Sequence, residues 1–112
     1  METKSALSAL SSLAQDSRLA IFRALVQIGP EGLPAGQISE ATGIPPSSLS
    51  FHLKELTHAG MVTSRQDGRF VIYAANFETM NGLIAFLTEN CCGGKACSPA
   101  RAVAKPIKRR AS

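Results

Sequence analysis

The sequence lacks any long apolar run, and this absence sets the first limit on what the protein can be. Its 112 residues contain no uninterrupted apolar stretch of about 18 residues, the length that a transmembrane helix needs. The segment from Met1 to Lys4 carries mixed charge and leads into a serine-rich stretch, so the N-terminus has no apolar region typical of a signal peptide. We therefore expect a single-domain cytoplasmic protein whose thiols are kept reduced.

Cysteine is scarce, and its arrangement disfavours a thiol enzyme. The three cysteines, Cys91, Cys92 and Cys97, lie within seven residues and include no Cys-x-x-Cys pair. The sequence also offers no catalytic base or cofactor-binding loop that would support a small reductase, so we predict that the protein is not an enzyme. In a reducing compartment, three clustered thiols indicate a metal-binding or redox-active site rather than a structural disulfide.

Acidic residues are outnumbered, but only because of one segment. The net charge of the whole chain is +4, whereas residues 1–97 hold seven Lys or Arg and all eight Asp or Glu, a net charge of −1. The other five cations lie in residues 98–112, a segment rich in Ala, Pro, Lys and Arg that we predict to be a disordered basic tail. A constitutive architectural DNA binder, which would use such a tail for salt-dependent affinity, is less consistent with a nearly neutral domain.

The apolar spacing predicts a mainly helical domain, residues 1–90, with one β-hairpin. Helices are expected over residues 5–14, from Asp16 or Ser17 to about residue 28, and over residues 34–42, 46–59 and 77–89. Their apolar stripes consist of Leu7, Leu10, Leu13 and Ala14; Leu19, Ile21, Phe22, Leu25 and Val26; Ile38 and Ala41; Leu49, Leu53 and Leu56; and Phe77, Met80, Leu83, Ile84 and Leu87, the last group being expected to be buried. Strands Met61–Arg65 and Arg69–Ala74 flank an Asp-Gly pair, which is a strong hairpin signal.

This order of elements is that of a winged helix-turn-helix, and several segments carry a resemblance to one family. These segments are Leu13–Ile21, Gly43–Leu56, Ala59–Val62 and Asp67–Tyr73. Over about residues 7–90 the sequence resembles the ArsR-type (ArsR/SmtB) metalloregulatory repressors. The resemblance implies a dimeric repressor of double-stranded operator DNA, with the helix over 46–59 as its recognition helix and the hairpin as its wing.

The leucine stripe of the predicted recognition helix decides which side chains can face DNA. Because Leu49, Leu53 and Leu56 must face the core, the intervening side chains point outward. The residues expected to contact DNA are Ser47, Ser48, Ser50, Phe51, His52 and Lys54, with Arg65 and Arg69 beside the hairpin tip. Hydroxyls can bond base edges or phosphates, an aromatic ring can contact a thymine methyl, and cations suit phosphates.

Three of these assignments have structural alternatives. Ser47 and Ser48 could instead cap the helix. His52 abuts the leucine stripe and is more readily a structural residue than a base reader. Arg69 could be a solvated cation of the hairpin.

The first and last helices present more apolar surface than one small domain can cover. In the family these helices pair across a two-fold axis, so the resemblance implies a homodimer that reads half-sites roughly 34–36 Å apart. The alternative is that the two helices pack only within one chain.

The ligand sites of the best-known family members are missing. Their arsenic repressors carry a Cys-Val-Cys site on the third helix, where this chain has Leu33–Ile38 and no cysteine. The zinc site of other members needs Asp and His on the final helix, and residues 77–89 contain neither.

What remains is an all-sulfur set formed by Cys91, Cys92 and Cys97, which Gly93 and Gly94 allow to converge. Three thiolates suit a trigonal pyramidal centre, and the sequence resembles the branch of the family that senses As(III) or Sb(III) through a C-terminal cysteine triplet. A fourth ligand would instead complete a Zn or Cd site. Cu(I) binding, a thiol-redox or reactive-sulfur switch, and an idle tail are further alternatives.

Overall fold

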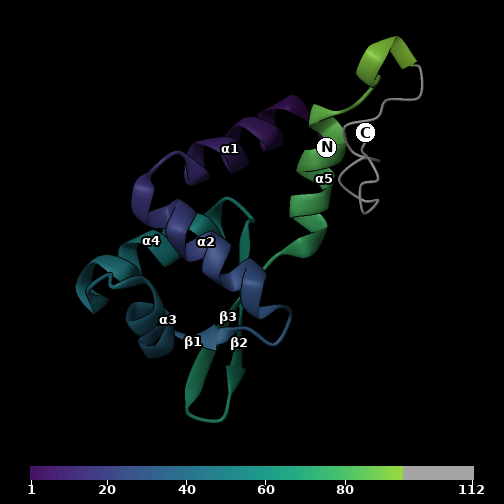
Figure 1. The fold of residues 1–112 in the computed structure, drawn as a ribbon. Helices are drawn as coiled ribbons and strands as arrows, with labels where there is room; N and C mark the ends of the chain where they lie inside the picture. Colours follow the sequence, from purple (N-terminus) through teal and green to yellow (C-terminus); the bar gives the residue numbers. More distant parts are fainter. Residues whose placement is uncertain (95–112) are drawn as a thin grey trace, which may run out of the picture.

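The computed structural model describes residues 1–94, which form one layer of helices against a small sheet (Figure 1). The helices are α1 (Thr3–Leu13), α2 (Asp16–Ile28), α3 (Ala35–Thr42), α4 (Pro46–His58) and α5 (Phe77–Leu87), followed by the short 3₁₀ turn η1 (Cys91–Gly94). The strands are β1 (Leu33–Pro34), β2 (Val62–Asp67) and β3 (Phe70–Ala75). Cys97 and the predicted basic tail, residues 98–112, lie outside the described residues.

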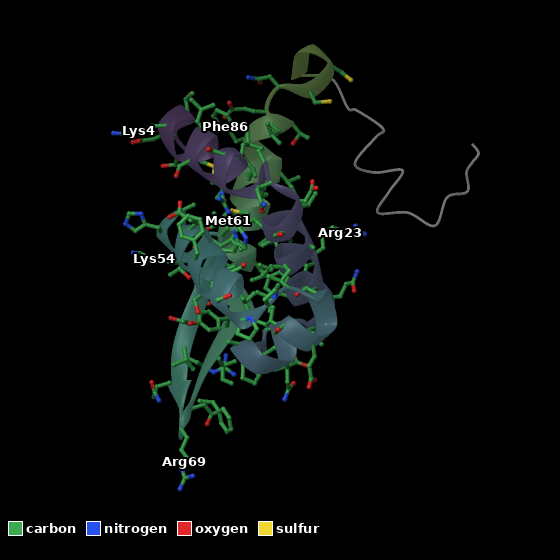
Figure 2. All side chains as sticks on the ribbon, turned by 90° about the vertical axis from the view of Figure 1, so that its left-hand side faces the viewer. Lys4, Arg23, Lys54, Met61, Arg69 and Phe86 are labelled. Atoms are coloured by element: carbon green, nitrogen blue, oxygen red, sulfur yellow. The ribbon has the colours of Figure 1, made fainter. Side chains whose placement is uncertain are left out.

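The core lies where α2, α3 and α4 meet the base of the hairpin. The three leucines of α4, Leu49, Leu53 and Leu56, are buried there as their spacing predicted. Met61 and Val62 close the core from the start of the hairpin, and Figure 2 shows Met61 at the centre of the molecule. Buried leucines on one face of α4 leave its opposite face to solvent, which is the arrangement that a recognition helix needs.

The hairpin is longer than its sequence predicted, and it carries a third strand. β2 and β3 pair antiparallel from Val62 with Ala75 out to Asp67 with Phe70, and β1 adds to the far edge of β3. Only two residues remain for the turn, Gly68 and Arg69. Gly68 has a φ of 63°, the positive value that the first turn position of a type II′ hairpin requires. The predicted strand end at Arg65 was therefore too early, because pairing continues to Asp67 beside the glycine, and the second strand ends at Ala75, one residue later than predicted, where it pairs with Val62. The winged helix-turn-helix fold itself is confirmed.

Several helix ends differ from prediction by one or two residues, and side-chain hydrogen bonds mark two of the ends. α2 is capped by Gln15, whose Oε1 accepts a hydrogen bond from the Arg18 amide at 2.9 Å, so neither Asp16 nor Ser17 is the cap. α5 ends at Leu87 rather than at residue 89, where the Thr88 hydroxyl donates to the Ile84 carbonyl at 2.8 Å.

Two apolar stripes are exposed rather than buried within the chain. On α1 the buried residues are Ala6, Ala9 and Ser12, while Leu7 is 61% exposed. On α5 only Leu83 is fully buried, and the predicted burial of Ile84 and Leu87 was wrong for the single chain, since they are 51% and 60% exposed. These helices lie at the end of the molecule opposite the hairpin tip (Figure 1), and their small contact with each other leaves the larger side chains facing outward.

One further leucine departs from the predicted pattern. Leu19, assigned to the stripe of the second helix, is 45% exposed, because α2 buries only Ile21, Phe22 and Leu25 fully. Within residues 1–94, no helix has the length and apolar character needed to cross a membrane.

Candidate nucleic-acid interface

The first turn of α4 is fixed by backbone groups, which leaves its serine hydroxyls for other partners. Pro46 occupies the first helical position, where its missing N–H costs nothing, and Pro45 precedes it without a side-chain cap. The Pro45 carbonyl accepts hydrogen bonds from the amides of Ser48 at 3.1 Å and Leu49 at 2.9 Å. The alternative that Ser47 and Ser48 serve as the helix cap is therefore wrong, and both side chains are exposed.

The outward face of α4 carries one aromatic side chain and one cation. Phe51 is 55% exposed, on the side of the helix away from the buried leucines. Lys54 and Ser50 are also exposed, and the Ser50 hydroxyl donates to the Pro46 carbonyl at 3.3 Å. Water gives an exposed phenyl ring no favourable contact, so this face has the composition of a surface that meets a partner.

His52 is half-buried, as expected of a side chain beside the leucine stripe, and it is tied to another helix. Its Nδ1 accepts a hydrogen bond from Nε of Arg18 on α2 at 3.3 Å. The guanidinium of Arg18 also lies over the Phe51 ring, 5.9 Å from its centroid. Sequence reasoning assigned Arg18 no role, although it falls within the Leu13–Ile21 segment that carried the family resemblance.

The two wing arginines occupy different environments. Arg69 lies in the two-residue turn and points away from the domain at the hairpin tip (Figure 2). Arg65 does not flank the tip, because the longer hairpin places it opposite Ile72 within the strands. Its Nη2 donates to the Glu31 carbonyl at 2.8 Å, so the guanidinium joins the wing to the loop before β1.

A shallow open groove of about 400 Å³ separates the recognition helix from the wing. From the helix it is lined by Ser50, Leu53, Lys54, Thr57 and His58, and from the wing by Ser64 and Tyr73. The lining is rich in hydrogen-bonding groups and includes a cation, which suits the sugar–phosphate backbone of a nucleic-acid strand. No local pattern assigns a role to Thr57, His58, Ser64 or Tyr73, because this groove exists only once the hairpin packs against α4.

The first two cysteines follow α5 directly. Asn90, Cys92 and Gly93 all have positive φ, and this tight turn brings the sulfur atoms of Cys91 and Cys92 to 3.6 Å from each other. Cys91 is half-buried and Cys92 is exposed. Within residues 1–94, no group of three or more His, Cys, Asp and Glu side chains is close enough to hold a metal ion; the third predicted ligand, Cys97, lies beyond that range.

Comparison with known proteins agrees with this geometry. Residues 13–65 match a family model described as a helix-turn-helix domain. The arsenical resistance operon repressor of Bacillus subtilis (strain 168) is 34% identical over 96 residues, covering 81% of this chain and 88% of that protein.

The fold is also found in solved structures of other regulators. An ArsR-like transcriptional regulator from Rhodococcus sp. RHA1 has a TM-score of 0.71 at 20% identity and covers 93% of this chain and 96% of its own. The domain Mb0332 from Mycobacterium bovis, described as a homodimeric winged helix-turn-helix DNA-binding domain, has a TM-score of 0.62 at 22% identity and covers 84% and 87%. The chain is a member of the ArsR family of DNA-binding winged helix-turn-helix transcriptional regulators.

Proposed function

We propose that this protein is a dimeric transcriptional repressor that leaves its operator when As(III) or Sb(III) binds the thiolates of Cys91, Cys92 and Cys97. The observation that supports a shared binding site at the cysteines is the 3.6 Å separation of the Cys91 and Cys92 sulfur atoms. Two thiolates that share one ion in tetrahedral geometry, each about 2.3 Å from it, are about 3.8 Å apart. The turn after α5 therefore already holds two sulfurs at the spacing of a shared soft centre.

The choice of a trivalent metalloid rests on the number of available ligands and on sequence similarity to a named arsenical repressor. The chain has three cysteines in all, which matches the three bonds of an As(III) or Sb(III) centre and falls one short of a closed zinc site. The B. subtilis relative is named as an arsenical resistance operon repressor. The spacing of two sulfurs alone is equally suitable for Zn(II), Cd(II) or Cu(I), so these ions and thiol oxidation are the competing inducers.

DNA reading is assigned to the exposed face of α4 and to the wing. We assign the exposed side chains of Ser47, Ser48, Ser50 and Phe51 to base edges in the major groove, and those of Lys54 and Arg69 to phosphates. His52 and Arg65 are held by protein partners, so we assign both to positioning rather than to direct readout.

The exposed leucine and isoleucine side chains of α1 and α5 support a homodimer. A second copy would cover Leu7, Leu10, Ile84 and Leu87, which solvent otherwise contacts. The similar M. bovis domain is described as homodimeric. A dimer would present two α4 helices to successive turns of the major groove.

Release follows from the position of the cysteines at the end of α5. A ligand that draws three thiolates together would reshape the chain next to this helix and so change how two protomers meet. The spacing of the two recognition helices would change with it. A ligand needs to favour the non-binding form by about 1–3 kcal/mol, the usual scale of allosteric coupling.

The test is operator binding measured by fluorescence anisotropy under reducing conditions, using the duplex that the protein selects from a random library. As(III) should release the wild-type protein, and replacing all three cysteines by Ser should abolish release while leaving DNA affinity unchanged. Since this variant contains no thiol, continued release by As(III) would refute the site.

Parallel titrations with Zn(II), Cd(II), Cu(I) and peroxide separate the competing inducers. Release by one of these agents at concentrations where As(III) has no effect would identify that agent, rather than the metalloid, as the inducer. Failure to select any duplex above random DNA would refute the repressor itself.

A further inference from the structure

Arg18 on α2 contacts α4 through two separate interactions, one with His52 and one with Phe51 on the reading face. It lies in the first turn of α2, where its backbone amide is held by the Gln15 side chain at 2.9 Å. Its guanidinium donates Nε–H to His52 and lies 5.9 Å from the Phe51 ring centroid. The Phe51 and His52 rings are themselves edge to face, with centroids 5.7 Å apart and an interplanar angle of 63°.

The hydrogen bond orients the histidine. An arginine Nε carries a proton and can only donate, so Nδ1 of His52 is the acceptor in this contact. Arg18 therefore holds the His52 ring in one orientation, and the His52 ring packs in turn against the Phe51 ring.

Phe51 needs this support because it is more than half exposed. An exposed phenyl ring without neighbours samples several rotamers, and DNA binding must then select one of them at an entropic cost. A guanidinium over the face of the ring and an imidazole at its edge both favour a single orientation.

We propose that Arg18 is a specificity-determining residue, which acts by holding Phe51 in the orientation that contacts a thymine methyl group in the operator. This inference rests on the proposed role of α4 in reading DNA. Arg18 acts through Phe51 and His52 and makes no base contact of its own. Its contribution appears only where the DNA carries the methyl group.

The experiment compares thymine with deoxyuridine, which differ at the contacted position only by that methyl group. Binding is measured by anisotropy on the selected duplex and on duplexes with each thymine in turn replaced by deoxyuridine. The variants are Arg18→Lys, which keeps the charge but removes the Nε–H and the planar group, Phe51→Ala, and the double substitution. Arg23→Lys is the matched control, since Arg23 is an exposed arginine on the same helix that points to the side of the molecule away from Lys54 (Figure 2).

For the wild-type protein and for Arg23→Lys, replacing one particular thymine by deoxyuridine should weaken binding. The same replacement should leave the affinity of Phe51→Ala unchanged. Arg18→Lys should weaken binding to the thymine duplex by about two- to tenfold, the size of the lost hydrogen bond from Nε to His52. It should bind the deoxyuridine duplex as the wild type does, and it should add no further loss in the Phe51→Ala background. Unchanged thermal unfolding would exclude a folding defect.

Three results would overturn the inference. Equal weakening on both duplexes would make Arg18 a contact to the DNA backbone, because its effect would then not depend on the methyl group. Wild-type affinity of Arg18→Lys for both duplexes would show that the contacts of Arg18 with Phe51 and His52 do not contribute to DNA binding. If the protein binds the selected duplex specifically but no single thymine-to-deoxyuridine replacement weakens binding, the Phe51 contact and this inference are refuted. The proposed repressor function would not be affected by that result.

Discussion

The dimer surface gives the prediction whose size follows most directly from the structure. Leu7 on α1 is 61% exposed in the single chain and would be covered by a second copy. Full burial of a leucine side chain contributes about 2 kcal/mol, so covering the exposed part contributes about 1.2 kcal/mol. A two-fold interface contains this residue twice, and Leu7→Ser should therefore cost the dimer about 2.4 kcal/mol, which is about a 50-fold rise in the dissociation constant.

Sedimentation equilibrium over a range of protein concentrations measures this constant directly. Phe70→Ser is the matched control, because Phe70 is also 61% exposed but pairs with Asp67 beside the turn of the hairpin. The hairpin turn lies at the end of the molecule opposite α1 (Figure 1). Substitution of Phe70 should leave dimerisation unchanged. An unaltered dissociation constant for Leu7→Ser, or an equal shift for both variants, would refute the assignment of α1 to the interface.

Four further substitutions test the reading face and the fold. Phe51→Ala should cost about 1–3 kcal/mol of operator binding and relax specificity in anisotropy titrations; unchanged affinity for operator and random DNA would contradict its role. Arg69→Ala should lower affinity similarly for all sequences and reduce the salt dependence by about one contact, whereas an effect on a single operator variant would mean that the arginine reads bases or groove width. Gly32→Ala should destabilise the protein by about 2–4 kcal/mol in urea denaturation, because Gly32 has a φ of +69° and its new Cβ would overlap the backbone carbonyl oxygen of Tyr73. Gly43→Ala, at a φ of +75° in open space, should cost only the strain of about 1–2 kcal/mol; an equal loss for both would show that the overlap at Gly32 relaxes.

Side-chain periodicity and local backbone chemistry determine much of the fold of this protein. The spacing of Leu49, Leu53 and Leu56 alone determined which face of α4 is buried, because a helix repeats every 3.6 residues whatever surrounds it. The Asp67-Gly68 pair located the hairpin, since a tight turn needs a residue that tolerates positive φ. The order of these local signals was sufficient for the winged helix-turn-helix and for the family.

Contacts between segments distant in sequence were decided only by the tertiary structure. Arg18 and His52 are 34 residues apart, as are Arg65 and Glu31, and no local pattern marks either pair. The same holds for the stripe of α1, where periodicity identified the apolar face but packing against the rest of the domain selected Ala6 and Ala9 for burial and left Leu7 outside. Periodicity reports which side chains avoid water, whereas only the assembled fold determines whether the covering surface belongs to the same chain.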